Sequence, residues 1–142
     1  MTPTELPATV AVPYDEKAVA VRRHLLGDDV FEAMKRDMTA LDAEWQTYTT
    51  NQLFGRTWAR GILSHQQLSL INLAMLAGLG RMEEFELHFR IALTRTGVPL
   101  VQLRELILHI GMYCGIPIAR ECFVIARKLF AELDVDVSGL EA

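Results

Sequence analysis

The chain has 142 residues, of which 51% are hydrophobic and 23% are charged, a balance typical of a single globular domain. Its formal net charge is −4 and it has no run of five basic residues, so nucleic acid is not an expected partner. No apolar run reaches the roughly 18 residues that a membrane span needs, and no membrane partner is expected. Two cysteines do not form a disulfide framework, which predicts a reduced, cytoplasmic protein.

Apolar residues recur at helical spacings along the chain, and no alternating strand pattern persists. We expect a flexible arm over residues 1–14, a single helical domain over 15–133 and an acidic tail over 134–142. Asp15 is suited to cap the first helix, Gly27 and Gly97 are expected to end helices, and Pro99 suits the start of a helix. In chain order, the predicted helical segments are Asp15 to Gly27, Val30 to Gly55 with a bend or restart at Thr39–Asp42, Ser64 to Gly78–Gly80, Met82 to Arg95, Leu100 to Met112, and Ile118 to Leu133.

The segment that begins at Ser64 carries the clearest local signals. Ser64 and Gln67 have the spacing of a capping box, which satisfies the first free amides of a helix. The residues that follow, 68–76, are apolar on nearly every side, so we expect this helix to be buried at the centre. The sequence therefore predicts an all-α bundle of six or seven short helices, with some apolar surface buried between subunits.

Glu84 and His88 are four residues apart, which places both side chains on one helix face. A carboxylate beside an imidazole favours the charged form, so we expect a raised pKa for His88 and proton donation near neutral pH. A surface ion pair on an amphipathic helix explains the same spacing. Arg90 lies two residues further on and is expected to point elsewhere.

Trp58 and Arg60 stand in a predicted loop, residues 56–63, just before the Ser64 helix. The planar guanidinium of Arg60 is suited to binding a carboxylate, and Trp58 is suited to forming the wall of a pocket. A tryptophan that fills a helix junction, with the arginine at the surface, is the equally weighted alternative.

His109, Cys114 and Cys122 complete the set of reactive side chains in the second half of the chain. His109 follows an apolar stretch, so it faces the core or contributes a polar contact to a substrate. Cys114 and Cys122 are eight residues apart, unlike a two-residue-spaced redox pair, and we expect Cys114 to be a small buried residue. No cluster at ligand spacing indicates a metal site.

Taken together, these residues resemble the carboxymuconolactone decarboxylase family, from about Val21 to Leu133. No single motif is decisive, but their order and spacing jointly carry the resemblance. The motifs are Trp58-x-Arg60, Ser69-Leu70-Ile71, Gly80-Arg81 with Glu84 and His88, Gly97-Val98, Glu105-Leu106-Ile107-Leu108-His109, and Tyr113-Cys114-Gly115-Ile116-Pro117-Ile118-Ala119.

The resemblance implies an alkylhydroperoxidase D-like all-α fold that forms ring-like homo-oligomers, here a trimer or hexamer. It implies a cofactor-free decarboxylase of a small carboxylated lactone or related acid in aromatic catabolism, within the β-ketoadipate pathway. In such an enzyme His88, tuned by Glu84, would donate a proton and Arg60 would bind a carboxylate. The expected substrate-binding residues are Trp58, Arg56, His109, Tyr113 and Cys114.

Two positions depart from the family pattern. Arg56 stands where family decarboxylases usually carry an acid, and Leu68 stands where they tend to carry an arginine. Both changes alter the expected charge of the pocket. A thiol peroxidase that uses Cys114 and a non-catalytic oligomeric protein are the alternative functions, although the two-residue-spaced cysteine pair of the peroxidase branch is missing.

Overall fold

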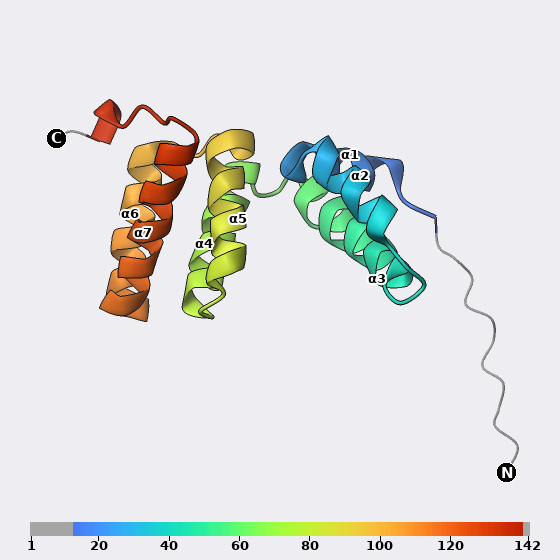
Figure 1. Cartoon of the computed structure of the whole chain (residues 1–142), viewed down its shortest axis with the longest axis horizontal. Helices are drawn as coiled ribbons and strands as arrows, with labels where there is room; N and C mark the ends of the chain where they lie inside the picture. The colour runs from blue at the N-terminus through green and yellow to red at the C-terminus, as the bar shows by residue number, and fades with distance from the viewer. Residues whose placement is uncertain (1–12, 141–142) are drawn as a thin grey trace, which may run out of the picture. The chain divides into compact units, whose positions relative to one another are not determined.

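The computed structural model describes residues 13–140, which form helices joined by short turns and contain no strand, so the all-α prediction is confirmed (Figure 1). Contacts divide the chain after Arg60 into an N-terminal unit and a C-terminal unit. The single domain over 15–133 stays a prediction. The arm expected over 1–14 lies outside the described residues except for Pro13 and Tyr14. No described helix is both long and apolar enough to cross a membrane.

The N-terminal unit begins with two helices that meet at Gly27. Asp15 caps the first of them through a 3.0 Å hydrogen bond from the amide of Lys17, and Gly27 ends it with a φ of 93°, as predicted. The break expected near Thr39–Asp42 separates the second helix from the third. The elements of this unit are α1 (Glu16–Leu26), α2 (Asp28–Asp37), α3 (Ala43–Tyr48), the π-helix η1 (Thr49–Phe54) and the 3₁₀ turn η2 (Trp58–Arg60).

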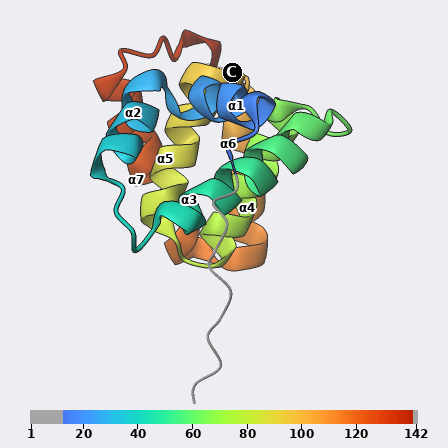
Figure 2. The same cartoon turned by 90° about the vertical axis from the view of Figure 1, so that its right-hand side faces the viewer.

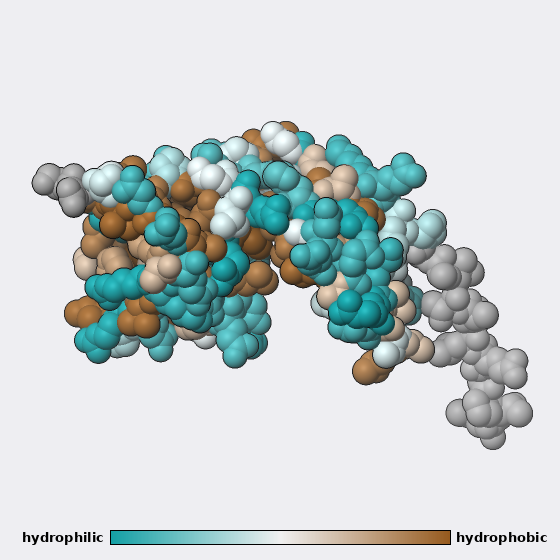
Figure 3. Space-filling model, turned by 45° about the horizontal axis from the view of Figure 1, so that its top comes forward, coloured by the Kyte–Doolittle hydropathy of each residue, from teal (hydrophilic) through white to brown (hydrophobic). Residues whose placement is uncertain are grey.

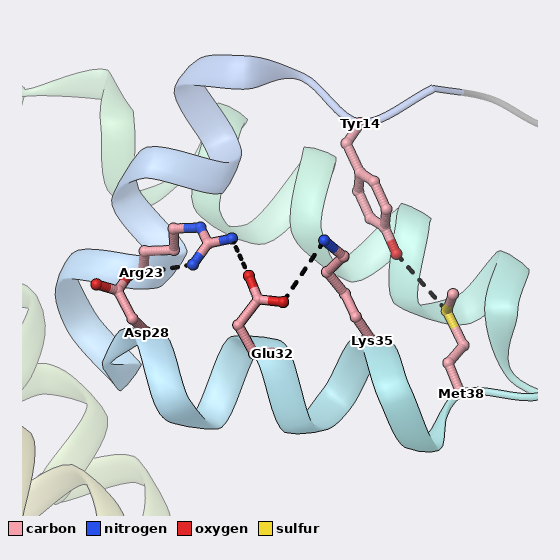
Figure 4. A network of polar contacts seen from close by, with 6 residues as sticks. All are labelled: Tyr14, Arg23, Asp28, Glu32, Lys35 and Met38. Carbon is pink, nitrogen blue, oxygen red and sulfur yellow. Dashed lines mark hydrogen bonds and ion pairs between the residues drawn. The ribbon is translucent and has the colours of Figure 1, made fainter.

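A surface network joins α1 to α2 on the outside of this unit (Figure 4). Arg23 of α1 pairs with Asp28 at 3.2 Å and with Glu32, and Lys35 approaches Glu32 at 3.7 Å. The guanidinium carbon of Arg23 also lies 4.3 Å from the centroid of the buried Phe31 ring. The arginine thus covers an apolar ring while its charge stays among solvated carboxylates.

The C-terminal unit is built from four helices that lie alongside one another (Figures 1 and 2). Helix α4 contacts α5 and α6, and α7 contacts α5 and α6, so the four enclose one core. Phe85 and Phe89 of α5 lie in that core with no exposed surface. The elements are α4 (His65–Gly78), α5 (Met82–Ile91), the π-helix η3 (Ala92–Thr96), α6 (Leu100–Cys114), α7 (Ile116–Glu132) and the 3₁₀ turn η4 (Ser138–Leu140).

The expectation that α4 is buried on every side is wrong for the described chain. Ser69, Leu73 and Ala77 form its single buried face. Ile71 and Met75, on other faces, are 42% and 53% exposed. Within its unit, the neighbours of α4 pack against one side of the helix, and its apolar composition extends beyond the face that they cover.

Exposed apolar side chains are also found at the ends of α6 and α7. Met112, Tyr113 and Ile116 are each more than two thirds exposed. Figure 3 shows apolar atoms at the surface of the C-terminal unit, among hydrophilic ones. Apolar surface of this kind marks sites of interaction.

The capping box at the start of α4 gives the first prediction. The Ser64 hydroxyl accepts a 3.1 Å hydrogen bond from the amide of Gln67, and the Gln67 side chain accepts one of 2.9 Å from the amide of Ser64. Ser64→Ala removes one of these, so we expect the free energy of unfolding to fall by about 1 kcal/mol in urea denaturation. Ser64→Asp, which keeps an acceptor, is the control and should lose much less; equal losses would contradict the capping role.

Candidate functional site

A cavity of about 880 Å³ lies in the N-terminal unit, between residues of α3, η1 and η2. Two of the predicted site residues, Arg56 and Arg60, line it together. Neither forms an ion pair with any residue between 13 and 140, so both guanidinium groups are available to an anion. The cavity is lined by Trp45, Tyr48, Thr49, Gln52, Leu53, Gly55, Arg56, Thr57 and Arg60.

Trp58 occupies a different position from its two neighbouring arginines. Its side chain is only 3% exposed and does not line this cavity, while Arg60 is exposed. The 3₁₀ turn that carries both residues packs on α1, so it is not the irregular loop expected for residues 56–63. In this turn Trp58 fills a junction between elements and Arg60 lies at the surface, which is the alternative given in the sequence analysis.

Several polar residues of the cavity were not found from the sequence. Tyr48, Thr49, Gln52 and Thr57 add hydroxyl and amide groups next to the two arginines, and no carboxylate of the described part of the chain lines the cavity. Their spacing gives no signal, because the π-helix η1 shifts the register by one residue relative to an α-helix. The lining is therefore cationic, and its three hydroxyls already donate hydrogen bonds to Glu44, Gln46 and Gln52.

Glu84 and His88 lie on α5 in the C-terminal unit, and His88 is half-buried while Glu84 is exposed. Burial lowers the pKa of His88 below its ordinary value of 6.5, and the charge of Glu84 opposes this only in part. The expected rise of the His88 pKa is thus wrong, because the loss of solvent outweighs an exposed carboxylate. The His88 Nδ1 atom is buried, with no hydrogen-bond partner among the described residues. Arg90 points elsewhere, as expected, and pairs with Glu132 at 2.8 Å.

His109 lines a second cavity, of about 500 Å³, beside α4 and α6 in the same unit. Glu105, one turn earlier on α6, lines it too, together with Gln102. The rings of His109 and Tyr113 are in contact, with centroids 4.8 Å apart and planes tilted by 43°, and Tyr113 is 82% exposed. Sequence reasoning chose His109 and Tyr113 but missed Glu105, although its four-residue spacing from His109 was a usable signal.

The two cysteines differ in environment. Cys114, at the end of α6, is exposed, so the expectation that it is a small buried residue is wrong. It lies at the solvent-facing end of its helix, beside the highly exposed Tyr113. Cys122 is fully buried in α7, and burial raises the pKa of its thiol to about 11. Among residues 13–140, no group of three histidine, cysteine or acidic side chains is placed to hold a metal ion.

Comparisons with known proteins agree with these motifs. The family model described as "Carboxymuconolactone decarboxylase family" matches residues 43–128. The chain is 28% identical to a 4-carboxymuconolactone decarboxylase of Acinetobacter baylyi over 120 residues, which cover 84% of this chain and 89% of that protein. It is 30% identical to a nitrosuccinic acid decarboxylase of Metarhizium robertsii over 118 residues, which cover 83% of this chain and 82% of that protein.

The environment of His88 gives the second prediction. In an NMR titration, the imidazole of His88 should titrate below pH 6.5, and Glu84→Gln should lower its pKa further by removing the favourable charge. The unfolded chain binds this proton more readily than the folded one, so stability falls as the pH drops through about 6.5.

The stability effect has its own control. His88→Gln removes the group that titrates, so this variant should lose the part of the pH dependence that His88 causes in urea denaturation at several pH values. A His88 pKa above 6.5 in the wild-type protein would contradict the dominance of burial.

Proposed function

The chain belongs to the carboxymuconolactone decarboxylase family, and we propose that it is a cofactor-free carboxy-lyase acting on a small carboxylated lactone or related acid. Two relatives bear the names of decarboxylases, one for 4-carboxymuconolactone and one for nitrosuccinic acid. Both named substrates are small acids with an electron-withdrawing group. We place the reaction of this chain in the same class, within aromatic catabolism and in the cytoplasm.

The proposed reaction needs two kinds of group. When the bond to the leaving carboxylate breaks, its electron pair moves into the neighbouring unsaturated or electron-withdrawing group, and carbon dioxide departs. Cations or hydrogen-bond donors stabilise that developing negative charge, and a proton donor then completes the product carbon.

The observation that carries the proposal is that two guanidinium groups line one cavity and pair with no carboxylate among residues 13–140. Arg60 binds a carboxylate of the substrate through its planar fork, and Arg56 adds a second positive charge to the same lining. The side-chain amide of Gln52 adds hydrogen-bond donors, whereas the hydroxyls of Thr49 and Thr57 donate to the carbonyls of Gln46 and Gln52. A cavity of this composition favours an acid with more than one acceptor group and disfavours a neutral or cationic ligand.

His88 is the proposed proton donor, with Glu84 as the group that favours its charged form. Because burial lowers the pKa of His88, the free enzyme carries a mostly neutral imidazole at pH 7. Negative charge close to the imidazole favours the imidazolium, and Glu84 supplies such a charge. His109, Tyr113 and the exposed Cys114 remain proposed substrate contacts.

A homo-oligomer, a trimer or hexamer, is the proposed assembly. The exposed apolar residues of α4, α6 and α7 support it, because subunit contacts would remove them from water. Light scattering of the purified protein tests this assembly, and a monomer would contradict it.

The proposed reaction is tested by following the loss of ultraviolet absorbance of 4-carboxymuconolactone, with nitrosuccinic acid as a second substrate. Arg60→Lys should raise KM about tenfold or more, because an ammonium cannot form the planar two-point contact. His88→Gln should lower kcat by at least about a hundredfold. The neighbouring Arg90→Lys, in a surface ion pair, is the matched control and should keep both constants.

The pH dependence of kcat/KM gives a second measurement in the same assay. This ratio should fall as the pH rises through the His88 pKa, below 6.5, and Glu84→Gln should move that fall to lower pH. Full turnover by His88→Gln would exclude His88 as the donor. A protein inert with both acids would favour a non-catalytic role.

The exposure of Cys114 is the observation that favours a thiol peroxidase as the second candidate. A second thiol would have to resolve the oxidised cysteine, and Cys122, buried and with a pKa of about 11, is poorly suited to do so. We expect a thiol-specific dye at pH 8 to label Cys114 in the folded protein and Cys122 only after denaturation. Peroxide-dependent turnover that Cys114→Ser abolishes would instead support the peroxidase.

A further inference from the structure

Arg22 of α1 is a buried cation that forms no ion pair with any described residue. It is 9% exposed, and its guanidinium carbon lies 5.4 Å from the centroid of the Phe54 ring and 5.9 Å from that of Phe31. Its two terminal nitrogens donate hydrogen bonds to neutral oxygens, at 2.7 Å to Thr50 Oγ1 and at 3.1 Å to Gln46 Oε1. Burying a charge without an opposite charge beside it is costly, so these two hydrogen bonds are the polar contacts that compensate Arg22.

Of the two partners of Arg22, Thr50 lies in the first turn of the π-helix η1, and Gln46 lies in α3, which leads into it. In an α-helix the carbonyl of Gln46 would accept the amide of Thr50. Here that carbonyl accepts the amide of Thr49, the hydroxyl of Thr50 at 2.7 Å and the hydroxyl of Thr49 at 3.2 Å. The wide turn of a π-helix is rarely stable without outside support. Arg22 bridges Gln46 and Thr50 across this turn and supplies such support.

The opposite side of η1 is part of the arginine-lined cavity. Thr50 and Phe54 are buried on the side of η1 that faces α1. Thr49, Gln52 and Leu53 line the cavity. A change in the winding of η1 would move these residues relative to one another.

The packing of α1 on this segment leaves little room for adjustment. A Cβ atom added at Gly55, which directly follows η1, would meet the Cβ of the buried Ala18 at 2.8 Å. Asn51 adds a second tie, because its side chain accepts the amide of Asp15 at 2.7 Å and donates to the carbonyl of Pro13 at 3.0 Å. Helix α1 is therefore a fixed support for η1, and Arg22 is its central polar contact.

We infer that Arg22 is a positioning residue, which sets the winding of η1 and thereby the arrangement of the anion-binding cavity lined by Arg56 and Arg60. This inference rests on the proposed role of that cavity in binding the substrate carboxylate. Arg22 itself does not line the cavity, so it acts through Thr50 and Gln46. This role requires the planar guanidinium of arginine. A lysine at position 22 would keep the charge but could not donate in one plane to both Thr50 Oγ1 and Gln46 Oε1.

The test measures binding of succinate, a small dicarboxylate, by isothermal titration calorimetry on the full chain. Arg22→Lys and Arg22→Met should each weaken succinate binding on the order of tenfold, as loss of a supporting contact typically does. Thr50→Val, which removes the hydroxyl with little change of shape, should weaken binding similarly, while Thr50→Ser keeps the hydroxyl and should bind as the wild type does. Combining Arg22→Met with Thr50→Val should weaken binding no further, because both changes break one network.

Arg23→Met is the matched control, since Arg23 lies next to Arg22 on α1 but pairs with surface carboxylates. It should keep wild-type affinity. Circular dichroism establishes that each variant is folded, and in the decarboxylase assay the Arg22 variants should raise KM while kcat stays within about twofold.

The inference is overturned if folded Arg22 variants keep wild-type succinate affinity, if Arg23→Met loses as much, or if the wild-type protein does not bind succinate. Failure of the proposed function looks different. A wild-type protein that turns over neither acid, but whose succinate affinity depends on Arg22 and Thr50, would refute the decarboxylase and leave the positioning role intact.

Discussion

The C-terminal unit depends on the burial of two aromatic rings on one face of α5. Phe85 and Phe89 are one turn apart, with centroids at 5.8 Å, and both are fully removed from solvent. Side chains advance by about 100° per residue around a helix, so Glu84 and His88, each one residue before a buried ring, lie together on one flank of the core. On that flank His88 is half-buried and Glu84 is exposed. The packing of α5 therefore determines that desolvation, and not the neighbouring carboxylate, controls the pKa of His88.

The N-terminal unit holds its polar groups in a different way. Arg22 is buried with neutral hydrogen-bond partners and two aromatic rings around it, whereas Arg56 and Arg60 remain exposed beside a cavity. One arginine thus supports the backbone, and the other two are free to bind a ligand. The π-helix η1 connects these roles, because its two sides face α1 and the cavity.

Local chemistry allowed much of the fold to be predicted. The capping residues Asp15 and Ser64 and the stop glycines Gly27 and Gly97 act within one helical turn, and the structure confirms each of them. The predicted burial of α4 was wrong, because burial depends on residues that are distant in the sequence. Periodicity showed that α4 is apolar on all sides, but only packing shows that Ile71 and Met75 stay exposed in the described chain.

The sequence by itself determined the helical class, the family and the identity of the candidate reactive groups, because these follow from residue type and spacing along the chain. Only the tertiary structure decided the environment of each group. It brought Arg56 and Arg60 to one cavity, buried Trp58, exposed Cys114 and reversed the expected shift of His88. The physical reason is that desolvation and cavity shape depend on which distant segments cover a side chain, and spacing along the chain does not carry that information.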